Sequence, residues 1–211
     1  MTKKKQVQEK DNSVRTLFAI VTILFLVSLS GVMFVKNSAK AKVETEYSNG
    51  FTFTKSNGFW HTDIKNAITG QIYDVEFRYS PNEVKDVQVV GNPKYFFKLL
   101  ELNNLTASYF TFDPEANLSG VNIVAADLAK FMNSIHGLVL VAGCTENETD
   151  ACAERPIITC ENQLDKAMVV YVKESDSPKI SLIKNCLTIE GRGPSLIQAQ
   201  NKLMFLWYGV L

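Results

Sequence analysis

Hydrophobic and polar positions divide the chain into one long apolar run and a longer part with short periodic segments. Residues 16–35 read TLFAIVTILFLVSLSGVMFV and contain no charge, proline, asparagine or glutamine. At 1.5 Å per residue, a helix of about 20 residues spans about 30 Å, the thickness of a bilayer hydrocarbon core. A helix also pairs its backbone groups internally. The run therefore predicts a single transmembrane helix in contact with membrane lipid.

A cleaved signal peptide is the main alternative to an uncleaved anchor. Ala39-Lys40-Ala41 has the small-x-small pattern of a signal peptidase site, so cleavage after Ala41 would release a secreted, disulfide-bonded protein. The apolar run is longer than the core of ordinary signal peptides, and Lys36 and Lys40 separate it from that site. These features favour a signal anchor.

Basic residues give the predicted anchor its orientation. Five of them precede the apolar run within residues 1–15, and three follow it, at Lys36, Lys40 and Lys42. Because cytoplasmic flanks carry the excess of lysine and arginine, residues 1–15 are predicted to be a cytoplasmic tail. Residues 36–49 are then a stalk, and residues 50–211 form one domain outside the cell membrane.

Alternating apolar positions predict strands in the first half of this domain. Segments 51–55 and 59–65 alternate briefly. The clearest strand is 73–79, where Tyr73, Val75, Phe77 and Tyr79 share one face and charged residues take the other. Such a strand has one buried and one wet face.

A strand, a helix and a second strand follow in the middle of the domain. Residues 107–112 are a predicted strand, and apolar residues recur at helical spacing over 121–135. Residues 138–142 are apolar throughout, which favours a strand covered on both faces. These segments predict a β-α-β unit with parallel strands.

The last third predicts three more strands and a closing helix. The strands are 157–160, 168–173 and 179–189, with the last two joined as a hairpin through 174–178. Gly193-Pro194 opens the helix. The apolar C-terminus is expected to pack into the core, and an exposed patch for a partner or lipid is the alternative. The fold class is therefore α/β or α+β, a transmembrane helix followed by one extracytoplasmic domain with a mixed sheet containing a β-α-β unit.

Four cysteines lie in the predicted outer domain. Cys144, Cys152, Cys160 and Cys186 have neither redox nor zinc-site spacing, and their even number predicts disulfides in an oxidising compartment. Pairing of Cys144 with Cys152 and of Cys160 with Cys186 is favoured. A thiol-active protein or four reduced buried thiols are the alternatives.

Glycosylation triplets and the charge pattern bear on which partners the protein binds. Asn104, Asn117 and Asn147 begin N-x-S/T triplets and are candidate glycosylation sites, although triplets arise by chance at a similar frequency. No basic stripe interleaved with aromatic residues is present, so no nucleic acid partner is predicted. A protein partner or self-assembly is expected.

Candidate chemistry is sparse. The sequence contains no metalloprotease, calcium-loop, nucleophile-elbow or phosphate-loop motif, so no catalytic residue, metal or cofactor is predicted. Because ligands of open α/β sheets collect beyond the carboxyl ends of strands, one candidate ligand edge follows strand 107–112: Asp113, Glu115, Asn117 and Ser119. A solvated turn is the simpler interpretation of this edge.

The two histidines differ in setting. His136 ends the predicted helix 121–135 and there complements the helix dipole, and His61 lies in strand 59–65.

The sequence thus favours a non-enzymatic, single-pass membrane protein whose outer domain acts as a structural, interaction or accessory subunit of a membrane or cell-surface complex. A membrane-tethered enzyme that uses the Asp113/Glu115 edge is the alternative function.

Overall fold

The computed structural model describes residues 20–24, 43–66, 69–115, 118–147, 149–150, 152–162 and 167–211. The chain divides into two compact units, residues 1–43 and 44–211. In the first unit a helical turn at 20–24 and Val43 are described, so the tail 1–15, most of the predicted anchor 16–35 and the site at 39–41 lie outside the described residues. Within the described residues, no helix combines the length and apolarity needed to cross a membrane. The anchor stays a prediction.

The second unit contains strands and helices in the following order: β1 (Thr45–Ser48), β2 (Phe51–Ser56), β3 (Phe59–Lys65), β4 (Ile72–Phe77), β5 (Gln88–Val90), the 3₁₀-helix η1 (Pro93–Tyr95), α2 (Phe96–Leu102), β6 (Ala107–Phe112), α3 (Leu118–His136), β7 (Val139–Ala142), β8 (Val169–Glu174), β9 (Lys179–Ile183), β10 (Cys186–Gly191) and α4 (Pro194–Tyr208).

The strands form two sheets in the described part of the chain. The first is an antiparallel four-stranded meander, β1-β2-β3-β4. The second has six strands in the order β5-β9-β10-β8-β6-β7 and is mixed, with β9 and β10 antiparallel and the other neighbours parallel. The fold is α+β, and the mixed sheet with its parallel β6-α3-β7 unit is confirmed.

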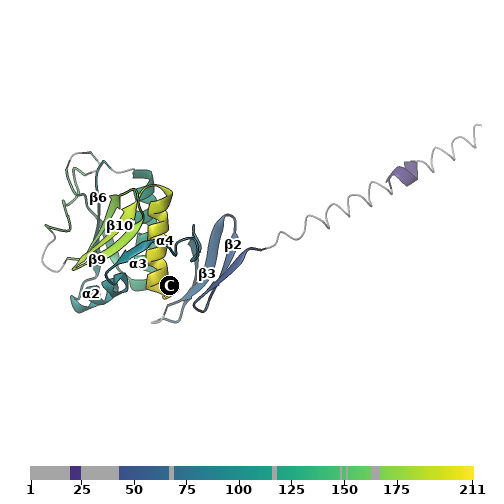
Figure 1. The fold of residues 1–211 in the computed structure, drawn as a ribbon, viewed down its shortest axis with the longest axis horizontal. Coiled ribbons are helices and arrows are strands. Elements are labelled where there is room, and N and C mark those ends of the chain that lie inside the picture. The colour runs from purple at the N-terminus through teal and green to yellow at the C-terminus, as the bar shows by residue number, and fades with distance from the viewer. Residues whose placement is uncertain are drawn as a thin grey trace, which may run out of the picture. The chain divides into compact units, whose positions relative to one another are not determined.

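Helix α4 lies between the two sheets (Figure 1). On one side it packs on β10. On the other side Phe205 contacts Phe77 and Phe53 of the four-stranded sheet, with ring centroids 4.4 and 5.5 Å apart. All three rings are fully buried, and each contributes about 2 to 3 kcal/mol through removal of apolar surface from water. The C-terminus thus packs into the core, as predicted.

Two amides of α4 are buried between the sheets. The Asn201 Oδ1 atom accepts hydrogen bonds from the backbone N–H groups of Arg78 and Tyr79, at 3.0 and 2.9 Å. The Asn201 side-chain nitrogen donates to Gln200 Oε1 at 2.7 Å. These bonds take the N–H groups of residues 78 and 79 out of the strand ladder. Strand β4 therefore ends at Phe77, two residues before the predicted end.

The predicted hairpin of 168–173 with 179–189 is wrong. The segment 179–189 bends at Lys184, whose φ of 53° is left-handed, and forms the hairpin β9–β10 by itself. Strand β8 then pairs with β10 in parallel. The two-residue turn Lys184-Asn185 contains no glycine, the residue that usually marks such a turn. The sequence therefore carries no signal that the run 179–189 contains two strands.

Three further predictions need correction. Strand β7 lies at a sheet edge, and Val139 is 57% exposed, so the apolar run at 138–142 is not covered on both faces. The predicted stalk 36–49 extends too far, because residues 45–48 form β1. Residues 157–160 form a single bridge, between Ile157 and Cys144, in place of a strand.

Both predicted disulfides are confirmed. Cys144 pairs with Cys152 and Cys160 with Cys186, and the described residues contain no free cysteine. Cys186 packs with Ile158 and Val169 in a small apolar cluster separate from the main core. The Cys160–Cys186 disulfide thus fastens the long loop after β7 to β10 of the six-stranded sheet, and Cys144–Cys152 closes a shorter segment within that loop.

We expect Asn201→Ala to destabilise the domain by about 2 to 4 kcal/mol, because two partly buried N–H groups lose their acceptor. Urea unfolding followed by circular dichroism measures the change. Gln198→Ala, one turn earlier in α4, is the control and should cost about 0.5 kcal/mol or less. Equal losses in both variants would contradict the role given to Asn201.

Candidate functional site

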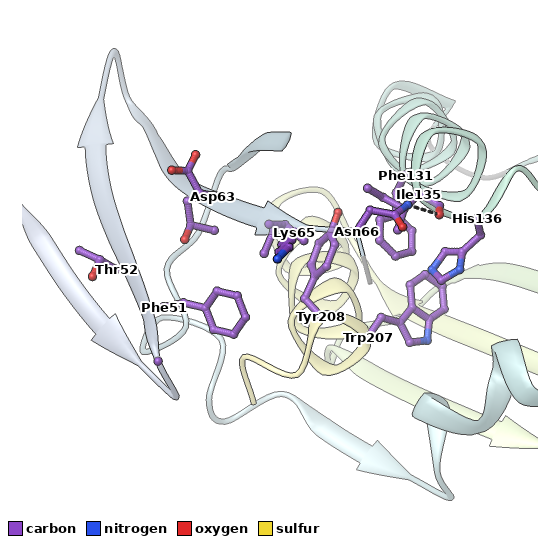
Figure 2. Close-up of a pocket in the computed structure, with 13 residues that line it drawn as sticks. Phe51, Thr52, Asp63, Lys65, Asn66, Phe131, Ile135, His136, Trp207 and Tyr208 are labelled. Atoms are coloured by element: carbon purple, nitrogen blue, oxygen red, sulfur yellow. Dashed lines mark hydrogen bonds between the residues drawn. The ribbon is translucent and has the colours of Figure 1, made fainter. Parts of the chain in front are cut away.

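The four-stranded sheet is split between β2 and β3. Their ladder pairs three positions beside the Asn57-Gly58 turn: Thr54–His61, Lys55–Trp60 and Ser56–Phe59. Beyond these positions the strands diverge (Figure 2), while β2 stays paired with β1 and β3 with β4. A cleft of about 650 Å³ lies between them, within the range of small-molecule sites.

Anchors on two different helices hold the split open. Ser48, the last residue of β1, donates its hydroxyl to the carbonyl of Val210 just beyond α4, at 3.0 Å. Asn66, at the end of β3, donates its side-chain amide to the carbonyl of Ile135 in the last turn of α3, at 2.9 Å (Figure 2). Because the far ends of the two hairpins are bound to different helix ends, β2 and β3 separate.

Aromatic side chains from α3 and α4 form the floor of the cleft. Trp207 stacks on Phe131 with ring centroids 5.3 Å apart, and Tyr208 meets Phe131 edge-on at 4.8 Å. The Trp207 indole N–H donates to the carbonyl of Pro93 at 2.9 Å. Ring packing on Phe131 and the hydrogen bond to Pro93 therefore hold the rings of the floor in position without a ligand.

The walls and rim of the cleft are more polar. Phe51 and Thr52 of β2 form one wall, and Asp63 and Lys65 of β3 form the other, with both charged side chains exposed (Figure 2). Burial raises the pKa of the Tyr208 hydroxyl, so it stays neutral at physiological pH and can donate and accept hydrogen bonds. The cleft thus combines an aromatic floor with a rim that carries both charge signs.

His136 closes one end of the cleft. Its ring stacks on Phe97 with centroids 3.9 Å apart and approaches Phe131 at 5.4 Å. Burial lowers the pKa of His136, so the neutral ring is favoured. The predicted position at the end of the helix is confirmed, but ring stacking replaces the predicted charge interaction with the helix dipole.

A smaller cavity of about 170 Å³ adjoins the cleft and shares Phe131, Ile135 and Tyr208 with it. Arg78 and Asp127 form an ion pair at this cavity. Burial raises the pKa of Asp127, although Arg78 opposes the shift. The pair links the residue after β4 to α3.

The predicted ligand edge lies elsewhere. Asp113 and Glu115 are exposed, and Asp113 Oδ1 accepts the Glu115 N–H at 2.9 Å, as in a simple turn. Asn117 lies outside the described residues, and Ser119 falls in the first turn of α3. At 1.5 Å per residue the edge is about 25 Å from the C-terminal end of α3, where the cleft lies. The ligand edge stays a prediction.

Other candidate residues are placed as follows. In the part of the chain that the structure describes, no three His, Cys, Asp or Glu residues are grouped to hold a metal ion. His61 Nδ1 lies 3.3 Å from Asp74 Oδ2 on the side of the four-stranded sheet that faces away from α4. Asn104 and Asn147 are exposed, and Asn117 is not described. Their glycosylation stays a prediction.

Comparisons with known proteins give no relative. No protein-family description, no curated protein sequence and no solved structure matches the chain. The cleft is therefore interpreted from its own geometry. Sequence reasoning missed it, since Trp207 and Tyr208 were assigned to the core and the strand runs 51–55 and 59–65 gave no sign of the split.

We expect His136 to make stability depend on pH. The pKa of folded His136 lies below the ordinary value of about 6.5, so its contribution is complete above that value and is lost as pH falls below it. His136→Phe keeps an aromatic ring on Phe97 and cannot titrate. The melting temperature should thus fall less between pH 7 and pH 5 in the variant than in the wild type. An identical fall in both proteins would contradict this assignment.

Proposed function

We propose that the protein is a single-pass membrane protein whose outer domain binds another component of a membrane or cell-surface complex through the cleft between β2 and β3. The cleft carries the proposal. It is large, its aromatic floor is held in place by packing, and its rim presents groups that can fix an orientation, which is the usual composition of a binding site.

Binding accounts for the cleft better than catalysis does. Its described lining offers Asp63, Lys65 and His136 as titratable groups with charge or base chemistry. The imidazole of His136 stacks on Phe97 and meets Phe131 edge-on, and Asp63 and Lys65 lie exposed at the rim. No nucleophile with a hydrogen-bonded base is among the described lining residues. Catalysis would need reactive groups beyond the described lining residues, whereas binding needs only the groups that are already there.

The disulfides and the N-terminal sequence support an outer location. Two disulfides persist in oxidising compartments and are rare in the cytosol. The apolar run 16–35 follows a basic segment, which favours a cytoplasmic N-terminus. The secreted form, cut after Ala41, remains the alternative to the anchored form.

We expect residues before and after the anchor to differ in accessibility. In intact cells, a membrane-impermeant maleimide should label Lys184→Cys, an exposed position in the β9–β10 turn, and should spare Lys5→Cys until the cells are lysed. Labelling of both positions before lysis would contradict the topology. A mature N-terminus at Lys42 would show that the protein is secreted.

We expect the cleft to contact the partner. p-Benzoylphenylalanine replacing Lys65 should crosslink one defined partner that also copurifies in stoichiometric amount, whereas the same replacement of Lys184 should not. Phe51→Trp, which narrows the cleft, should lower the yield at Lys65 at least about fivefold, the effect of losing about 1 kcal/mol of contact. Equal yields at Lys65 and Lys184 would refute the role of the cleft.

A further inference from the structure

Backbone groups of β2 face the cleft. The Lys55 N–H donates to the Glu44 carbonyl at 2.9 Å, so residues 55, 53 and 51 are the ones that bond to β1. In an antiparallel pair the residues in between turn their N–H and C=O groups to the opposite side. Thr54 uses that side to pair with His61. Thr52 turns the same side into the open cleft.

Strand β3 has the same arrangement on the other wall. His61 pairs with Thr54 of β2, so Asp63 and Lys65 turn their N–H and C=O groups in the same direction. The β2–β3 ladder stops before either residue, and no other backbone partner for Thr52, Asp63 or Lys65 is found in the described part of the chain. Both walls therefore present backbone N–H and C=O groups to the cleft that are not used in the β2–β3 ladder.

We infer that the cleft accepts an extended peptide segment of its partner as an additional strand between β2 and β3. This inference rests on the proposed function and names its ligand class. A peptide strand carries N–H and C=O groups on both edges, so it can satisfy both walls at once. Because β2 and β3 are antiparallel, the strand runs parallel to one of them and antiparallel to the other.

The size and chemistry of the cleft set the form of the peptide. The open stretches, 51–53 on β2 and 62–65 on β3, match three to four residues, about 10 to 13 Å at 3.3 Å per residue. Alternate side chains of the bound strand point to opposite faces. One set meets Phe131, Trp207 and Tyr208 of the floor, and the other set points to solvent beside Asp63 and Lys65. An alternation of apolar and polar residues fits this site.

The edge strand β7 is the competing place for strand addition. It exposes Val139 and Val141, but it offers one wall with no floor beyond it, and exposed edges occur in many sheets. The cleft offers two walls and an aromatic floor, which gives more hydrogen bonds and more apolar burial per residue. β7 therefore serves as the internal control.

A pair of proline variants tests the β2 wall. Thr52→Pro removes the N–H that faces the cleft and leaves the bonds to β1 intact. Tyr47→Pro is the matched control, since Tyr47 lies directly opposite Thr52 and its N–H faces the free outer edge of the sheet. A phage-displayed library of random heptapeptides is selected on the full-length chain in mild detergent. The selected peptides should bind Thr52→Pro about three- to tenfold more weakly than wild type, and Tyr47→Pro unchanged.

Two measurements on the wild-type chain do not depend on the folding of variants. Bound peptide should slow amide hydrogen exchange at Thr52, Asp63 and Lys65 at least about tenfold, with no change at Val141 of β7. N-methylation of any central amide of the peptide should weaken binding about three- to tenfold through loss of one ladder bond, and N-methylation of the end residues should have little effect.

The outcomes separate this inference from the proposed function. If no peptide is selected, or if binding ignores N-methylation and leaves exchange at the three amides unchanged, strand addition is refuted. If the crosslink from Lys65 is nevertheless obtained, the cleft binds its partner by side chains alone. If the crosslink also fails, the proposed function fails as well. Protection of Val141 in place of Thr52 would assign strand addition to β7.

Discussion

The arrangement of the domain depends on the satisfaction of buried polar groups on a helix that is covered on both sides. Helix α4 lies between the sheets, and an amide buried there without partners costs about 1 to 3 kcal/mol. Asn201 avoids this cost by accepting two N–H groups from the end of β4. The same bonds end β4 at Phe77 and fix the end of this strand to α4. The ring of Phe77 then packs on the ring of Phe205.

The open cleft follows from where the sheet is fastened. Asn201 holds it at the end of β4, Ser48 holds one far end on Val210, and Asn66 holds the other on Ile135. Closing the sheet would regain the β2–β3 ladder bonds, each worth about 0.5 to 1.5 kcal/mol net. It would also pull at least one hairpin from its helix and disturb the aromatic floor. The anchors and the floor thus outweigh the missing ladder bonds.

The sequence predicted those features that depend on neighbours along the chain. Alternation located β2, β3 and β4, helical spacing located α3, and the favoured cysteine pairing matches the two disulfides. It failed where distant contacts decide the outcome. The apolar run at β7 became an edge, and the run 179–189 folded back at Lys184. The cleft depends on hydrogen bonds between residues more than sixty positions apart, such as Asn66 and Ile135, which no local pattern records.

Helix α3 keeps the two candidate sites apart. The carboxylates Asp113 and Glu115 lie before its N-terminus, and the cleft contains His136 at its C-terminus. A ligand held by the cleft over three or four residues does not reach across about 25 Å of helix. An activity at the carboxylate edge would therefore need its own binding groups, and the described residues there form a solvated turn. The cleft, in contrast, already combines fixed apolar surface with backbone groups that have no ladder partner.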